Sequence, residues 1–204
     1  GSISIPLNCS VSEGIGGSAA AQTRGEQLNT TVAWDNLGTY IDTFYVAAWK
    51  GGSEFVPEDT EVTKGAPLWK TSTEYRWEAP EEATFYAYAN LPASGSDVTA
   101  TSAGQTLDYT VPATYSEQKD ILMGCYTGRP QYNDTLHKGG IAEVRFYHPL
   151  TAVRFKMGTF AGTTSFQIKS ISLNGVYASG SAEMNPTTMA ATDCGDFFSW
   201  TPGS

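Results

Sequence analysis

The sequence predicts an all-β protein, an antiparallel β-sandwich with low helix content, from three observations. Short segments with an apolar residue at every second position recur along the 204 residues, and this period is typical of half-buried strands. Clusters of glycine, proline and serine separate the segments, as turns do. No long segment carries the 3.6-residue period of an amphipathic helix. Several short strands at this spacing indicate a sandwich or a barrel.

The first predicted strand, residues 3–11, has the most regular alternation in the chain. Its apolar positions are Ile3, Ile5, Leu7, Cys9 and Val11. Because proline has no N–H to donate, Pro6 predicts that this strand lies at a sheet edge or on a wet face. The following residues 13–25 are rich in glycine, serine and alanine, and this composition predicts an exposed, mobile loop.

Further strands are expected at short intervals along the chain. They span residues 39–50, 68–77, 84–90, 107–111 and 120–126. These segments are rich in the β-branched and aromatic residues that strands favour. The polar stretch through Pro57 and Lys64 predicts a loop between the first two of them.

Residues 141–157 predict two strand segments that meet at a corner. Before Pro149 one face carries Ala142, Val144, Phe146, His148 and Leu150. Beyond Pro149 the apolar residues have the other parity, at Val153, Phe155 and Met157. A shift of one residue turns every side chain to the opposite face, so a bulge or tight corner is expected near residues 148–151. Val144, Phe146, Val153 and Phe155 are predicted core residues.

The predicted organisation is one sandwich over residues 1–157, followed by a region of different character over residues 158–204. Residues 158–165 indicate a linker of small residues, and residues 166–177 predict one or two strands. The rest is rich in threonine, glycine and alanine. A segment this short cannot complete a sandwich by itself. These strands therefore either complete the first sandwich or begin a truncated second β domain.

Charge and composition exclude several classes of protein. A net charge of −9 without any cluster of lysine and arginine argues against a nucleic-acid partner, because phosphate binding needs a basic surface. Charged residues make up 16% of the chain, below the ~25% usual for soluble domains, which favours an extracellular β protein. Cys9, Cys125 and Cys194 have no close pair that would indicate zinc. They are either buried free thiols or one disulfide with a leftover thiol.

No enzyme is predicted, and no cofactor or metal is expected. The only histidines are His137 and His148, and no Gly-x-Ser-x-Gly motif places a nucleophile beside them. His148 continues the alternation of Phe146 and is interpreted as a hydrogen-bonded core or corner histidine. The acidic residues 58–61 are interpreted as solvated loop charges. They could bind calcium weakly, although the spacing of an EF-hand loop is absent.

Aromatic residues make up 12% of the chain and have two possible roles. Trp34, Trp49, Trp69 and Trp77 either fill the core and join strand pairs, or form a sugar-stacking platform. Buried tryptophans would indicate the first role, and an exposed coplanar pair would indicate the second.

Seven motifs also follow one another along the chain. They are residues 23–25, 44–49, 69–77, 85–90, 120–124, 146–151 and 171–175. Their residues include Thr-Arg-Gly at the first, Phe-Tyr-Ala-Tyr-Ala-Asn at the fourth and Phe-Tyr-His-Pro-Leu-Thr at the sixth. In this order they resemble the fimbrillin family of surface proteins and pilus subunits of Bacteroidales. The resemblance implies a transthyretin-like sandwich in an exported fimbrial or adhesin subunit of the cell surface. It further implies attachment to the outer membrane through a lipidated cysteine upstream of Gly1.

The resemblance also implies processing and strand exchange. In the family, an arginine-directed protease cuts after the first strand, and the groove that is opened accepts a segment of the next subunit. The matching elements are residues 3–11, the loop that follows them, and Arg24 with Gly25. Arg24 is otherwise an ordinary surface arginine. The implied partners are other fimbrial subunits and host or bacterial surface ligands. The alternative function is a carbohydrate-binding module of a surface glycan-uptake system.

Overall fold

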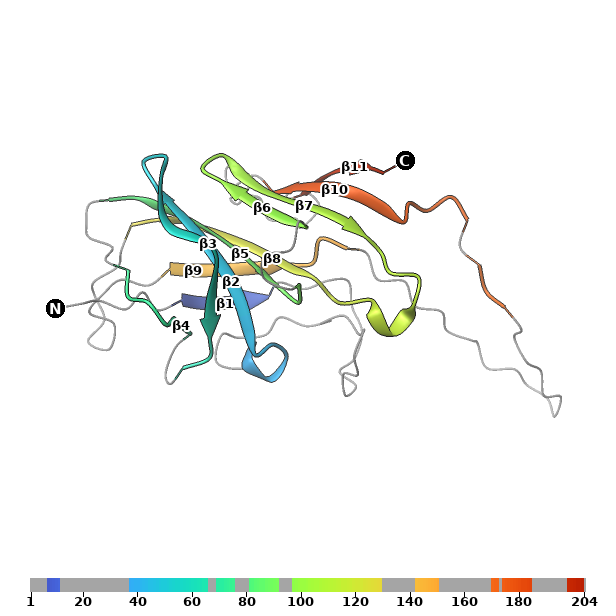
Figure 1. Ribbon diagram of the computed structural model, residues 1–204, viewed down its shortest axis with the longest axis horizontal. Helices are drawn as coiled ribbons and strands as arrows, with labels where there is room; N and C mark the ends of the chain where they lie inside the picture. The colour runs from blue at the N-terminus through green and yellow to red at the C-terminus, as the bar shows by residue number, and fades with distance from the viewer. Residues whose placement is uncertain are drawn as a thin grey trace, which may run out of the picture.

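The computed structural model describes residues 7–11, 37–65, 69–75, 81–91, 97–129, 142–150, 170–172, 174–184 and 198–203. Within these residues the chain forms two β-sheets and two short 3-10 turns, Leu37–Thr39 (η1) and Tyr115–Glu117 (η2), without an α-helix. Figure 1 shows strands β6, β7, β10 and β11 lying together across the larger sheet. The predicted all-β sandwich with low helix content is confirmed. None of the helices in the described part of the chain is long and apolar enough to cross a membrane.

The larger sheet has seven strands in the order β1-β9-β8-β5-β2-β3-β4. In chain order they are β1 (Leu7–Val11), β2 (Thr43–Lys50), β3 (Ser53–Thr63), β4 (Lys70–Thr71), β5 (Ala83–Ala89), β8 (Leu122–Gly128) and β9 (Ala142–Tyr147). Neighbouring strands are antiparallel except β1 and β9, which are parallel. A parallel pair cannot be joined by a tight hairpin, and these two strands come from distant parts of the chain.

The smaller sheet has four antiparallel strands in the order β11-β10-β7-β6. They are β6 (Val98–Thr101), β7 (Gly104–Thr110), β10 (Ser179–Met184) and β11 (Phe198–Pro202). β10 pairs with β7 from Ser179 opposite Thr110 to Met184 opposite Gln105. Strands from residues 158–204 therefore share a sheet with strands from the earlier part of the chain.

The polar stretch through Pro57 was predicted to be a loop, and that prediction is wrong. It lies in β3, where Val46 pairs with Thr60 and Ala48 pairs with Val56. Residues 57–59 are therefore left opposite Ala47 and form a β-bulge, in which Asp59 has a φ of 58°. A bulge interrupts both the hydrogen-bond ladder and the period of two. This is why the strand could accept Pro57 and why its pattern was hidden in the sequence.

The region between the corner and β10 also differs from its prediction. The described residues 170–172 and 174–177 lie outside any strand, although strands were expected there. The apolar side chains of Ile171, Val176 and Tyr177 are exposed. In these described residues the apolar pattern did not produce a strand, and residues 166–169 and 173 lie outside the described residues.

The larger sheet is apolar on both faces, and each face has its own cluster of buried residues. The first cluster contains only residues of the larger sheet and its connections. Its members are Leu37, Ile41, Phe44, Val46, Ala48, Val56, Val62, Trp69, Ala83, Phe85, Ala87, Ala89, Leu122, Ala142, Val144 and Phe146. The second cluster joins the two sheets. Its members are Ala47, Tyr86, Tyr88, Ala100, Leu107, Ile121, Met123, Cys125, Tyr147, Ala182 and Met184.

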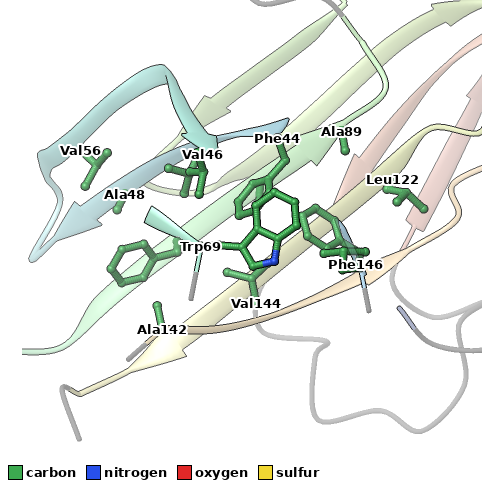
Figure 2. Close-up of a cluster of buried hydrophobic side chains, with 14 of the residues drawn as sticks. Phe44, Val46, Ala48, Val56, Trp69, Ala89, Leu122, Ala142, Val144 and Phe146 are labelled. Carbon is green, nitrogen blue, oxygen red and sulfur yellow. The ribbon is translucent and has the colours of Figure 1, made fainter. Parts of the chain in front are cut away.

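Trp69 lies at the centre of the first cluster. Figure 2 shows its indole ring surrounded by Phe44, Val144 and Phe146. The ring centroids of Phe44 and Trp69 are 5.3 Å apart, and those of Phe44 and Phe146 are also 5.3 Å apart with an edge-on geometry. Aromatic pairs at this separation add to the stability gained from burial alone.

Strand β9 confirms Val144 and Phe146 as core residues, since both are almost completely buried. Val153, Phe155 and Met157, on the other side of the predicted corner, lie outside the described residues. β9 ends at Tyr147, directly before that corner. Leu150 was predicted to share the face of Phe146, but it packs against the second cluster instead. The strand alternation does not continue beyond Tyr147, so it cannot place Leu150.

Candidate functional site

The candidate site is the edge of the larger sheet formed by β1 and its neighbour β9. The register runs in parallel from Leu7 opposite Ala142 to Val11 opposite Phe146. Among the described residues β9 is the only strand that pairs with β1. Pro6 predicted an edge or a wet face for this strand, and within the described residues β1 (Leu7–Val11) is the last strand of the sheet. Ile3, Ile5, the following loop, Arg24 and Gly25 lie outside the described residues, and Cys9 is placed within β1.

Strand β9 carries part of the main core directly behind this edge. Ala142, Val144 and Phe146 are each at most 1% exposed and belong to the first cluster. These three are in register with the odd-numbered positions of β1, which are the apolar positions of its sequence. The backbone edge that β1 covers and the buried apolar cluster are therefore next to each other.

A glycine sets the distance between β8 and β9. Gly124 lies opposite Phe146, and a Cβ atom added to it would be 2.5 Å from the carbonyl oxygen of Arg145 and 2.9 Å from a methyl group of Val144. Because atoms do not approach so closely, a side chain here would push β9 away from the sheet. Gly124 thus helps to place the strand to which β1 is bound.

Besides the apolar contacts of the second cluster, two hydrogen bonds among the described residues link the smaller sheet to the larger one or its connections, and neither involves β1. The indole N–H of Trp200 in β11 donates to the carbonyl oxygen of Pro149, just after β9, over 3.0 Å. At the opposite side, the N–H of Ala100 in β6 donates to a carboxylate oxygen of Glu58 in the bulge of β3. β1 lies beyond β9 in the strand order. Among the described strands it is therefore the one beyond β9, and the hydrogen bond from Trp200 reaches only the residues after β9.

His148 occupies the corner after β9 and is hydrogen-bonded, as its position in the sequence predicted. Its Nδ1 is 2.7 Å from Oδ1 of Asp120, and the two side chains are 5% and 13% exposed. The carbonyl oxygen of Asp120 accepts a hydrogen bond of 2.6 Å from the side chain of Asn90. The His148–Asp120 pair thus joins the end of β9 to the residues before β8. His137 lies outside the described residues.

The described tryptophans of the predicted set are used in packing. Trp69 is 2% exposed, and Trp49 is half-buried with its ring edge-on to Tyr86 at a centroid distance of 5.7 Å. The core role predicted for them is confirmed for Trp69. Trp34 and Trp77 lie outside the described residues.

A second polar region lies between the sheets, at the bulge of β3. Glu58 and Asp59 were interpreted as solvated loop charges; they lie in a strand instead, where Glu58 is exposed and Asp59 is partly buried. Both also line a cavity of about 10 Å³, enough for one water molecule. The hydroxyl of Tyr88 donates to Oδ1 of Asp59. Tyr86 and Gln105 also line this cavity. In the described part of the chain, no three histidine, cysteine, aspartate or glutamate residues are grouped as metal ligands.

Burial changes the chemistry of the two tyrosines in this region. It raises the pKa of Tyr86 from 10.0 to about 12. The pKa of Tyr88 is also raised, by burial first and then by its hydrogen bond to Asp59 and by the charge of that residue. Both phenols therefore stay neutral to a higher pH than an exposed tyrosine does. The sequence pointed only to the acidic residues 58–61, which could bind calcium weakly. The other residues of this region come from different strands, so no sequence motif joins them to Glu58 and Asp59.

Comparisons with known proteins assign no family: the chain matches no protein-family model, no curated protein and no solved structure. The function is therefore argued from the geometry of the candidate site.

Proposed function

We propose that this protein is a cell-surface fimbrial or adhesin subunit that assembles or anchors by exchange of an edge strand. The observation that supports the proposal is the place of β1 at the end of the sheet formed by the described strands, in parallel register with the buried residues of β9. Loss of β1 would leave the N–H and C=O groups of β9 unpaired and expose the apolar cluster beside them. A strand from another subunit can satisfy both needs at once.

The position of β1 along the chain also supports exchange. Residues 12–36 separate β1 from the next described element, η1. A single cut within them would turn β1 into a peptide held by non-covalent contacts alone. Arg24 lies within this stretch, so cleavage after Arg24 would have that effect. Among the described residues this five-residue strand is paired on one side, so it makes few backbone hydrogen bonds there and its release should cost little free energy.

The proposal includes membership of the fimbrillin family, with a transthyretin-like sandwich. It also includes export to the outer membrane through an upstream lipid anchor, and other fimbrial subunits as partners. The alternative, a carbohydrate-binding module, has less support. Of the four tryptophans that could form a sugar-stacking platform, the two that the structure describes pack against Phe44 and Tyr86.

Limited digestion with an arginine-specific protease tests the proposal. We expect the folded chain to be cut first after Arg24, with release of the N-terminal strand and formation of oligomers that size-exclusion chromatography detects. Arg24→Ala should prevent both the cut and the oligomers. Arg129→Ala is the matched control, because Arg129 is exposed directly after β8, and this variant should behave as the wild type.

A synthetic peptide of residues 1–11 separates strand exchange from simple aggregation. Added in excess to the cut chain, it should occupy the edge of β9 and suppress the oligomers. The same peptide with Leu7→Asp and Val11→Asp should not, because these positions are in register with buried Ala142 and Phe146. If the cut chain stays monomeric with its N-terminal strand bound, the exchange proposal is wrong. The protein would then be a static surface protein.

A further inference from the structure

Five side chains with oxygen atoms line the cavity at the bulge of β3; Tyr88 donates its hydroxyl to Asp59, and the other four are the candidate ligands. They are Glu58 and Asp59 of β3, Tyr86 of β5 and Gln105 of β7. We propose that this cavity binds a divalent cation that prefers oxygen ligands, and that Ca²⁺ is the preferred ion. This inference is independent of the edge strand and of the function proposed for it.

Two buried oxygen atoms in the cavity wall have no hydrogen-bond partner. They are the hydroxyl oxygen of Tyr86, whose residue is 0% exposed, and Oε1 of Gln105, whose residue is 1% exposed. Buried polar atoms without a partner are rare because they have lost water and gained nothing in return. The two atoms come from different sheets and face one small cavity. A single bound ion could satisfy both of them.

The carboxylates favour an ion over a water molecule. Glu58 is held at the cavity wall by the N–H of Ala100, and Asp59 is held there by the hydroxyl of Tyr88. Glu58 is exposed and Asp59 is partly buried, and two negative charges beside one cavity attract a cation more strongly than they attract a neutral molecule. The net charge of −9 on the whole chain acts in the same direction.

The bulge is what brings the two carboxylates together. In a regular strand, neighbouring side chains point to opposite faces. Glu58 and Asp59 are neighbours that line the same cavity, and Asp59 has a φ of 58°. Few residues other than glycine adopt this conformation, and aspartate and asparagine are among those that do. The backbone irregularity therefore has a direct effect on the charge at the cavity.

The set of donors selects the kind of ion. Two carboxylates, an amide oxygen and a phenol oxygen are hard ligands, which suit Ca²⁺ better than the softer transition metals. Ca²⁺ also accepts irregular geometry, whereas Mg²⁺ needs a nearly ideal octahedron. Four protein ligands leave the rest of the shell to water. Because only two of the ligands carry a charge, binding should be weak, with a dissociation constant of about 10⁻⁴–10⁻³ M, as in other sites of low charge.

Titration of the chelator-treated full chain with CaCl₂ tests the site by calorimetry and thermal unfolding. Glu58→Gln and Asp59→Asn remove one charge each, yet both retain an oxygen that can accept from Ala100 or Tyr88. Asparagine also tolerates the φ of position 59. We expect each variant to weaken Ca²⁺ binding by about tenfold or more, the loss that follows from removing one charged ligand. Glu61→Gln is the matched control, since Glu61 is exposed on the same strand and lies outside the cavity lining.

Three outcomes would overturn the inference. The wild type could show neither heat of binding nor a shift in melting temperature up to about 10 mM CaCl₂, a concentration well above the dissociation constant expected for such a site. Glu61→Gln could reduce binding as much as Glu58→Gln, which would indicate diffuse attraction to an acidic surface. MgCl₂ could bind as tightly as CaCl₂, which contradicts the selectivity. Loss of Ca²⁺ binding in Tyr86→Phe, with the fold retained, would support the site.

Discussion

The two faces of the larger sheet are both buried, but they differ in chemistry. The first cluster is built from aliphatic side chains, phenylalanine and Trp69. The second cluster, between the sheets, includes the buried tyrosines Tyr86, Tyr88 and Tyr147. Of the buried side-chain atoms without a partner in the described residues, Tyr86 OH and Gln105 Oε1 lie between the sheets, and none lies in the first cluster.

This difference shows which features each face can support. Apolar side chains need only close packing, so the first face is stabilised by shape and area alone. Each tyrosine between the sheets adds apolar area but also brings a hydroxyl group that must find a partner. The face with hydroxyl groups is therefore the one at which a specific ligand can improve stability. The face without them should respond to loss of volume alone.

The largest effect is expected where the first cluster loses volume. Phe146 is 0% exposed and contacts Phe44 edge-on, so Phe146→Ala should lower the free energy of unfolding by about 3–5 kcal/mol through lost burial and the cavity left behind. Chemical denaturation with a fluorescence or circular-dichroism signal measures this change. Tyr177→Ala is the control, because Tyr177 is 71% exposed and should change stability by less than about 0.5 kcal/mol. A loss below about 1 kcal/mol for Phe146→Ala would contradict its assignment to the core.

Much of the first face could be predicted from the sequence, because period-two alternation describes it directly. Strand β9 follows such a pattern, and Val144 and Phe146 were predicted as core residues from parity alone. Strands β5 and β8 are buried on both faces, so their sequences are almost continuously apolar and were recognised by composition instead. Strand β10 could not be predicted in this way. Its residues include Ser179, Gly180 and Ser181, which provide little apolar signal, and its pairing with β7 and β11 supplies the missing stabilisation. The context of a strand, in this case, outweighs its own propensity.

The candidate strand-exchange site at β1 and the cavity between the sheets also differ in how far the sequence predicts them. Pro6 predicted an edge or a wet face for β1, because the effect of a missing N–H is local, and β1 is the last of the described strands in its sheet. The cavity between the sheets could not be inferred. Glu58, Tyr86 and Gln105 are far apart in the sequence, and they meet only through the register of three strands and the packing of one sheet on the other. The bulge that places Glu58 and Asp59 also removed the alternation that would have identified β3.

The second-largest effect is expected at alkaline pH, on the face between the sheets. The pKa of Tyr86 is raised from 10.0 to about 12 by burial, so the folded state keeps a proton that the unfolded state loses. The contribution of Tyr86 to the free energy of unfolding is fully present below about pH 10, and it is lost as the pH rises to about 12. Two pKa units correspond to roughly 2–3 kcal/mol. Urea denaturation at a series of pH values measures this fall, and Tyr86→Phe should reduce it.

Tyr88 contributes to the same alkaline loss, since its pKa is raised as well, so part of the fall should remain in Tyr86→Phe. Tyr40→Phe is the control, because Tyr40 is 40% exposed and its removal should leave the wild-type profile unchanged. If Tyr86→Phe loses as much stability as the wild type between pH 10 and 12, burial of the phenol is not what makes this face sensitive to alkali.

The smallest effect on the free energy of unfolding is expected for Tyr86→Phe at neutral pH in the presence of a chelator. The sign of this effect distinguishes the two faces of the larger sheet. Tyr86→Phe removes a buried hydroxyl that has no partner among the described residues, so the free energy of unfolding should change by less than about 1 kcal/mol and towards greater stability. Tyr88→Phe instead removes the donor to Asp59 and should cost about 1–3 kcal/mol. If both variants are destabilised equally, the Tyr86 hydroxyl has a partner in solution even without added ions. The face between the sheets would then be as fully satisfied as the first face, and the two would differ in composition alone.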